Sequence, residues 1–108
     1  MKSIQLSRVI GESQRAGKAA LEFLRVPAMS LSTYCLRAGA PDPQRPHTED
    51  EVYYVVRGRA QFRAGDESCA VEPGTVLFVE AGVEHRFHSI EADLELLVVF
   101  APAEGTRA

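Results

Sequence analysis

The stretch from residue 39 to residue 58 reads GAPDPQRPHTEDEVYYVVRG and contains the first part of the candidate site. His47 and Glu51 lie four residues apart at the start of an apolar segment, residues 52–56. Side chains alternate between the two faces of a strand, so this spacing predicts that both point to the same face. A carboxylate at the edge of such an apolar segment carries a desolvation cost unless it is paired or bound to a metal.

A second histidine, His85, follows directly after a turn that we expect at Gly82. If both hairpins line one barrel, then His47, Glu51 and His85 converge on its interior. Two neutral imidazoles and one carboxylate form a facial triad that suits Fe(II) and also accepts Mn, Ni or Zn, with open positions for substrate or water. The sequence therefore predicts a site for one divalent transition metal (Fe, Mn, Zn or Ni).

Turn signals recur at short intervals from residue 38 onward, and the segments between them are rich in Val, Tyr, Phe and Leu. Evenly spaced short strands are typical of an all-β sandwich or barrel. A hairpin turn with positive φ is expected at Gly58, between the second and third of the predicted strands. These strands cover residues 29–37, 51–57, 59–64, 67–72, 75–79, 84–90 and 93–101.

The 108 residues are enough for one domain with a single core. We expect a barrel at residues 29–102, an N-terminal arm at residues 1–28 and a frayed tail at residues 103–108. Within the arm, strands at Ser3–Ile10 and Leu21–Val26 are preferred over a short helix within residues 14–24, because Gly17 and the lack of a capping residue weaken the helix.

Composition excludes several kinds of partner. The net charge is −3 and no basic stripe is present, so a nucleic-acid partner is not expected. The longest apolar run, residues 96–101, is far too short to cross a membrane, and the first residues do not resemble a secretory signal. We therefore expect a cytoplasmic protein in which Cys35 and Cys69 stay as thiols.

Two segments together resemble a known family. The positions of Gly39, His47, Glu51 and Gly58 resemble the first motif of the cupin superfamily, Gly-x5-His-x-His-x3-Glu-x6-Gly, with Arg45 where the first histidine is usual. The chain from Gly74 to Ser89 resembles the second motif, Gly-x5-Pro-x-Gly-x2-His-x3-Asn. There, Glu80 replaces the proline and Ser89 replaces the asparagine.

This resemblance implies a small single-domain cupin, which is an all-β jelly-roll β-barrel of the double-stranded β-helix type. It also implies that His47, Glu51 and His85 are metal ligands inside the barrel. Arg45 leaves four alternatives open: a site with three protein ligands, Gln44 as an additional oxygen ligand, Arg45 pointing inward to bind an anionic substrate group, or a metal-free pocket.

Strand alternation also predicts residues around the site. Tyr53 shares a face with Glu51, and Phe87 shares a face with His85, so Tyr53 and Phe87 are candidates for the substrate pocket. Arg45 is a third candidate, because its guanidinium could bind an anionic group. His88 falls on the opposite face from His85, and we expect it outside the barrel. Cys35 is expected to be a buried structural residue.

Two functions remain open from the sequence. The first is a metal-binding protein with enzymatic activity, either a dioxygenase-like oxidoreductase or an isomerase acting on a small polar metabolite. The alternative is a non-catalytic module that binds or senses a small molecule, and the sequence identifies no catalytic base for the first. A homodimer is expected, formed through residues 31–36, residues 94–101 or the N-terminal arm.

Overall fold

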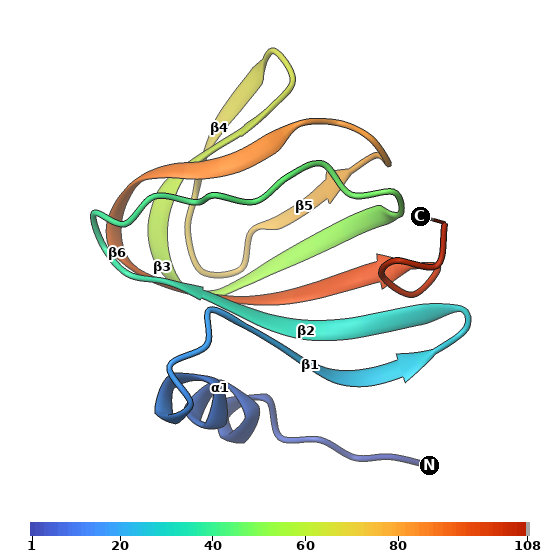
Figure 1. Cartoon of the computed structure of the whole chain (residues 1–108). Coiled ribbons are helices and arrows are strands. Elements are labelled where there is room, and N and C mark those ends of the chain that lie inside the picture. Colours follow the sequence, from blue (N-terminus) through green and yellow to red (C-terminus); the bar gives the residue numbers. More distant parts are fainter. Residues whose placement is uncertain (108) are drawn as a thin grey trace.

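A computed structural model describes residues 1–107 as one helix and six antiparallel strands (Figure 1). The sheet has the order β1-β2-β6-β3-β4, and β5 pairs with β3. The all-β jelly-roll fold expected from the sequence is confirmed. The elements are α1 (Leu6–Arg15), β1 (Ala20–Val26), β2 (Met29–Leu36), β3 (Asp50–Ala64), β4 (Glu67–Val71), β5 (Val76–Val79) and β6 (His85–Ala101).

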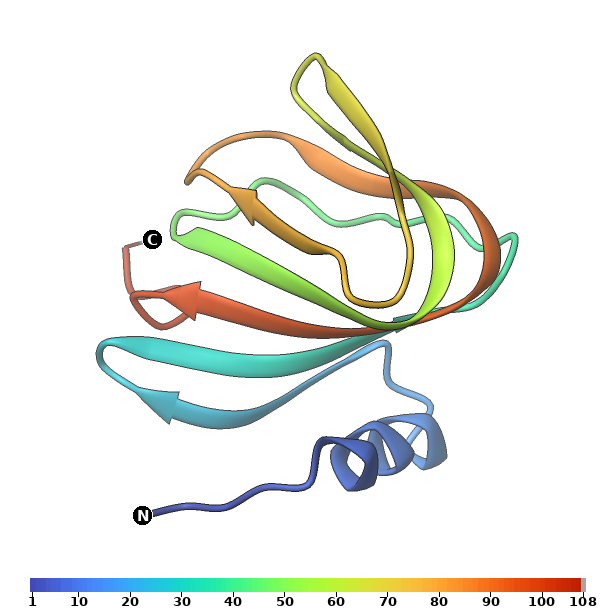
Figure 2. The ribbon, with the colours of Figure 1, turned by 180° about the vertical axis from the view of Figure 1, so that it is seen from behind.

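The two longest strands, β3 and β6, form the frame of the barrel. They pair with each other at both ends, from Asp50 opposite Ala101 at one end to Ala64 opposite His85 at the other. Between these ends the register shifts at several points, and both strands bend sharply there. Seen from either side, the bent pair curls the sheet around a common interior (Figures 1 and 2).

The hairpin expected at Gly58 is wrong, because β3 runs through this position as one strand. The predicted strands at residues 84–90 and 93–101 are likewise a single strand, β6. Gly58 does have the positive φ that was expected, +102°, but it lies in an irregular part of the β3–β6 pairing. A Cβ at this position would lie 2.4 Å from the carbonyl oxygen of Asp93, so only glycine lets the two strands approach this closely.

The N-terminal arm differs from its prediction in one element. Leu21–Val26 is part of a strand, as expected. The strand predicted at Ser3–Ile10 is wrong, because the helix α1 spans Leu6–Arg15. Val9, Ile10 and Ser13 are buried on one side of this helix, with the i, i+1 and i+4 spacing of a helical face. The helix packs against β1 and β2.

The tail is also more ordered than predicted. Ala103 is buried, and the backbone N–H groups of Gly105 and Arg107 donate hydrogen bonds to the carboxylate of Glu49. The prediction of a frayed tail is therefore wrong for residues 103–107. Residue 108 lies outside the described part of the chain.

The core fills the barrel beneath the candidate site. Tyr53 is completely buried, and its ring packs edge-on against Phe62 and Phe87, with centroid distances of 5.7 and 5.1 Å. Val55 and Leu96, two further buried side chains, belong to the same cluster. Tyr53 thus anchors its ring in the core and presents its hydroxyl to the site above. No helix among residues 1–107 is long and apolar enough to cross a membrane.

The close approach at Gly58 leads to a stability prediction. Gly58→Ala should lower the free energy of unfolding by about 2 kcal/mol more than Gly74→Ala, because the added methyl group overlaps the backbone of β6. Gly74 is a matched control, since its φ is +95° and an added methyl group there would meet no heavy atom within 4 Å beyond its chain neighbours. Urea unfolding of both variants measures the difference, and equal losses would contradict the steric role of Gly58.

Candidate metal centre

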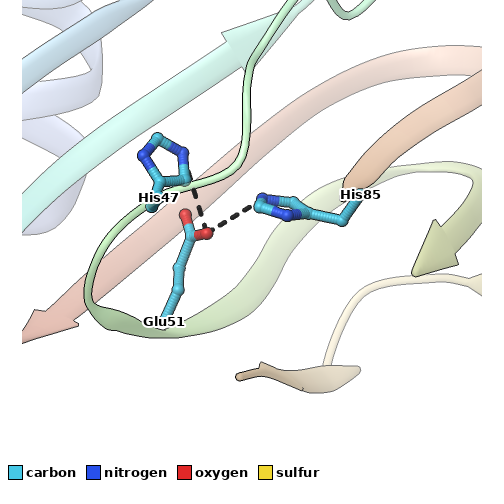
Figure 3. A group of neighbouring side chains, drawn as sticks. All are labelled: His47, Glu51 and His85. Atoms are coloured by element: carbon cyan, nitrogen blue, oxygen red, sulfur yellow. Dashed lines mark ion pairs between the residues drawn. The ribbon is translucent and has the colours of Figure 1, made fainter. Parts of the chain in front are cut away.

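His47, Glu51 and His85 converge inside the barrel, as the sequence predicts (Figure 3). Each offers one ligand atom, and these atoms lie within 4.8 Å of one another. Glu51 Oε1 lies 3.0 Å from His85 Nε2 and 3.9 Å from His47 Nε2. Glu51 is on β3, His85 is the first residue of β6, and His47 lies in the loop before β3. That these three residues bind a metal stays a prediction.

A contact with the backbone of Val83, on the side of the ring away from the site, fixes the orientation of His85. His85 Nδ1 lies 2.8 Å from the carbonyl oxygen of Val83, so this nitrogen carries a proton and donates it. Nε2 therefore faces the interior, between Glu51 and the Tyr53 hydroxyl. Burial lowers the pKa of His85, but the contacts with Glu51 and the Val83 carbonyl outweigh this effect and raise it above its usual range.

The buried carboxylate of Glu51 fits a bound cation. Its side chain is 2% exposed, and among the described residues no hydrogen bond of normal geometry reaches Oε1, although His85 Nε2 is close. Leaving a buried carboxylate oxygen without a donor is costly. A divalent cation held by this oxygen and two imidazole nitrogens would remove that cost, and the N, N, O donor set suits a transition metal.

Gln44 and Tyr53 lie directly beside the three candidate ligands. The Tyr53 hydroxyl donates to Gln44 Oε1 at 2.8 Å, and the same oxygen lies 3.4 Å from His47 Nε2. Burial and the nearby Glu51 raise the pKa of Tyr53 well above its usual range, so the hydroxyl keeps its proton. Gln44 is thus near enough to influence the site, but its oxygen is already engaged by Tyr53.

Two predicted pocket residues lie elsewhere. Arg45 is exposed and does not line the cavity, so the hypothesis that it points inward is wrong. Asp42 and Gln44 turn inward in this extended loop, and Arg45 falls on the opposite side, where its charge stays hydrated. Phe87 is 1% exposed and packs beneath Tyr53, so it belongs to the core and does not form a wall of the pocket.

The remaining predicted residues lie away from the centre. His88 is half-buried outside the site, with Nδ1 3.0 Å from Ser89 Oγ. Cys35 is half-buried and Cys69 is exposed, and both are free thiols. Burial and the nearby Glu95 raise the pKa of the Cys35 thiol, while a hydrogen bond with Ser13 on α1 partly opposes the rise. Neither cysteine lies near the candidate ligands.

Sequence reasoning missed Asp42, which organises the loop before β3. Its carboxylate accepts hydrogen bonds from the Tyr34 hydroxyl at 2.5 Å, from Gln44 Nε2 at 2.6 Å and from the Phe87 backbone N–H at 2.9 Å. Burial and the bond to Asp42 raise the pKa of Tyr34 well above its usual range. The signal in the sequence was a single acidic residue between two prolines, Pro41 and Pro43.

A cavity of about 200 Å³ opens beside His47 and Glu51, two of the three candidate ligands. Its wall combines apolar side chains with hydroxyl, amide and carboxylate groups, and no lysine or arginine is among the lining residues. Glu104, from the tail, also lies at this wall. It is the second residue, after Asp42, that sequence reasoning missed. The lining residues are Ala20, Ser32, Thr33, Tyr34, Gln44, His47, Glu51, Tyr53, Val98, Phe100 and Glu104.

Comparison with known proteins agrees with this fold. Residues 32–100 match the cupin domain family, and the chain belongs to this family. It is 47% identical over 105 residues to the uncharacterized protein SCO3923 of Streptomyces coelicolor, with 97% of this chain and all of that protein covered. The structure of TT1209 from Thermus thermophilus is 27% identical and superposes with a TM-score of 0.74, over 95% of this chain and 99% of that one.

Two enzymes share the fold at lower identity. The DMSP lyase DddQ from Ruegeria pomeroyi is 20% identical with a TM-score of 0.72, and the match covers 77% of this chain but only 46% of the lyase. A salicylate 1,2-dioxygenase from Pseudoaminobacter salicylatoxidans is 19% identical with a TM-score of 0.73, over 88% of this chain and 31% of the dioxygenase. At this identity the likeness concerns the fold alone.

The role of Asp42 can be tested by its amide variant. Asp42→Asn should lower the free energy of unfolding by about 2 kcal/mol, because an amide N–H₂ would face the donors on Gln44 and Phe87. Asp66→Asn, in the exposed turn between β3 and β4, is the matched control and should change stability little. Urea unfolding compares the two, and a loss no larger than that of the control would disprove this role of Asp42.

Proposed function

We propose that this chain is a metal-dependent cupin enzyme, a dioxygenase-like oxidoreductase or an isomerase, that acts on a small polar metabolite. The observation that carries the proposal is the buried Glu51 Oε1. Among the described residues it accepts no hydrogen bond of normal geometry, and it lies 3.0 and 3.9 Å from two imidazole nitrogens beside a cavity. A lyase and a dioxygenase with the same fold show that such a barrel can carry chemistry of this kind, although fold alone does not select the reaction.

Each residue of the candidate site would have a distinct role. His47, Glu51 and His85 would hold one divalent Fe, Mn, Zn or Ni ion, which supplies Lewis-acid polarisation or activation of dioxygen when bound. The Val83 carbonyl orients His85, and the Tyr53 hydroxyl with Gln44 holds the polar wall beside the ligands. Apolar side chains on the cavity wall limit the access of water to the metal-facing side.

The cavity favours a small and uncharged substrate. Its volume of about 200 Å³ is below the range of pockets for drug-sized ligands. With Arg45 outside, no lysine or arginine among the described residues lines the wall of this cavity to pair with a carboxylate or phosphate group of the substrate. Glu104 adds negative charge at the same wall. We therefore expect recognition through hydroxyl and carbonyl groups instead of through an anionic group.

The second candidate function is a binding or sensing module without turnover. It is favoured by Arg45, which replaces one histidine of the first cupin motif and leaves three candidate protein ligands. Consumption of dioxygen or loss of a small hydroxy or carbonyl compound in the presence of Fe(II) separates an enzyme from such a module. The cytoplasmic location expected from the sequence stays a prediction.

Metal content is the direct test of the site. Protein expressed with Fe, Mn, Zn or Ni available should contain nearly one equivalent of metal, and His85→Ala should lose most of it because one of three ligands is gone. His88→Ala is the matched control, since His88 lies three residues away and outside the site, and it should keep its metal. Elemental analysis of the purified proteins measures this.

Two controls separate loss of a metal ligand from loss of folding in His85→Ala. Circular dichroism checks that His85→Ala is folded, and Glu51→Gln provides a second variant that removes a ligand charge with little change of shape. Absence of metal from the wild type, together with no uptake on titration, would overturn the proposed metal function. Equal metal content in His85→Ala and wild type would place the metal elsewhere.

We also propose that the protein is a homodimer, joined through the outer face of β3, β5 and β6. Side chains from these strands form an apolar patch in two rows that follow the strand register: Val99, Val52 and Phe78 in one row, and Leu97, Tyr54 and Val76 in the other. Antiparallel sheets normally have polar side chains on a face that contacts water. Here Val76 and Phe78 are 64% and 66% exposed.

The size and surroundings of this patch fit a second copy of the chain. Phe78, Val76 and Tyr54 together expose on the order of 300 Å² of mainly apolar surface, a large share of the roughly 800 Å² that each partner buries in a standard dimer. Arg57 and Glu95 form an ion pair on these strands, so the surrounding surface carries both signs of charge. An apolar centre with a mixed polar rim can meet its own copy across a two-fold axis.

The dimer is tested by one substitution in the patch and one outside it. Val76→Asp, on β5, should convert the dimer into a monomer. Val26→Asp, which changes an exposed valine on β1, should leave the dimer intact. Light scattering coupled to size-exclusion chromatography measures the mass, which should be twice 11.8 kDa for the wild type. A monomeric wild type would contradict the proposal, and loss of the dimer only in Val26→Asp would assign the interface to the N-terminal arm.

A further inference from the structure

The tail after β6 is tied to the barrel next to the cavity. We define the C-terminal strap as residues 103–107. The backbone N–H of Glu104 donates to Ser30 Oγ at 2.9 Å, and Arg25 Nη2 donates to the carbonyl oxygen of Glu104 at 2.5 Å. Ser30 and Ala103 are both buried. The backbone of Glu104 is thus held on both sides by the β1–β2 hairpin.

Glu49 provides the second anchor of the strap. Its side chain is 1% exposed and accepts hydrogen bonds from the backbone N–H groups of Gly105 at 3.0 Å and Arg107 at 2.9 Å, and from Thr48 Oγ1 at 2.6 Å. Burial would raise the pKa of Glu49, but the bonds from Thr48 and these backbone groups lower it below its usual range. Glu49 lies between His47 and Glu51 in the sequence, so the strap is joined to the segment that carries two candidate ligands.

These anchors bring the side chain of Glu104 to His47. Glu104 Oε2 lies 3.6 Å from His47 Nδ1, while the opposite nitrogen, Nε2, faces Glu51 and Gln44. The ring of Phe100 packs edge-on against His47 at a centroid distance of 4.8 Å and limits rotation of the imidazole. The two nitrogens of His47 therefore have different surroundings: a carboxylate at Nδ1 and the candidate metal position at Nε2.

We propose that Glu104 is a positioning residue for His47. Its carboxylate favours the tautomer in which Nδ1 carries the proton, against the oxygens of Gln44 and Glu51, which favour a proton on Nε2. The Nδ1 tautomer leaves the Nε2 lone pair free on the side of Glu51 and His85. An imidazole that gives its Nε2 lone pair to a cation becomes a stronger donor at Nδ1, which strengthens the contact with Glu104. The strap is thus part of the metal site, and this inference rests on the proposed function of His47, Glu51 and His85.

The first readout uses the metal-free protein. In ¹⁵N-labelled wild type, at a pH where the imidazoles are neutral, NMR chemical shifts should show a larger population of His47 with its proton on Nδ1 than in Glu104→Ala. Glu104→Ala should shift this population toward the Nε2-protonated tautomer, and Glu104→Gln should shift it less because its amide oxygen attracts the Nδ1 proton, though more weakly than a carboxylate does. Glu84→Gln, an exposed carboxylate near His85, is the matched control and should leave the tautomer of His47 unchanged. An unchanged tautomer in Glu104→Ala would overturn the proposal.

The second readout is the affinity for Co(II), measured by titration and by its visible spectrum. Glu104→Ala should bind Co(II) roughly 10- to 100-fold more weakly than the wild type and with an altered spectrum, which is the usual effect of removing a carboxylate that is hydrogen-bonded to a metal-bound histidine. Glu84→Gln should match the wild type. Equal affinity and spectrum in Glu104→Ala would also overturn the proposal. If the wild type takes up no Co(II), the proposed metal function fails, and the NMR result alone decides whether Glu104 positions His47.

Discussion

The pairing of β3 with β6 is the interaction on which the rest of the structure depends. Glu51 lies near one end of this pair and His85 lies at the other end, so in a flat sheet they would be far apart. The bend around Gly58, where the backbone of β6 approaches too closely for any side chain, folds the two ends toward each other. The same bend encloses the core around Tyr53 and leaves the cavity above it.

The buried carboxylates of Glu49 and Glu51, near the start of β3, have different roles because their surroundings differ. Glu49 accepts hydrogen bonds from the strap and from Thr48, so its charge is satisfied by the chain alone. Oε1 of Glu51 has no such donor among residues 1–107 and faces two imidazoles, so a cation or a protonated histidine is needed to satisfy its charge. A loop that is fixed by the first carboxylate can therefore present the second one, with His47, to a metal.

Much of the fold and the convergence of three side chains could be predicted, because strand alternation and turn residues act locally. β2, β4 and β5 lie within about one residue of their predicted positions. Gly58 was misassigned because a positive φ serves a hairpin and a bulge equally well. The helix α1 was missed because it has no capping side chain and no acidic residue in its first turn, and has Gly11 in its middle. Parity alone could not separate a core residue such as Phe87 from a pocket residue. Asp42 and Glu104 act through contacts with distant segments, which no local pattern records.

Anomalous diffraction from crystals grown with Mn(II) tests the central claim most directly, because it locates the ion independently of any activity. The account predicts one strong anomalous peak inside the barrel, at bonding distance from His47 Nε2, a carboxylate oxygen of Glu51 and His85 Nε2, with Glu104 on the Nδ1 side of His47. A peak at another position, or coordination through His47 Nδ1, would contradict it.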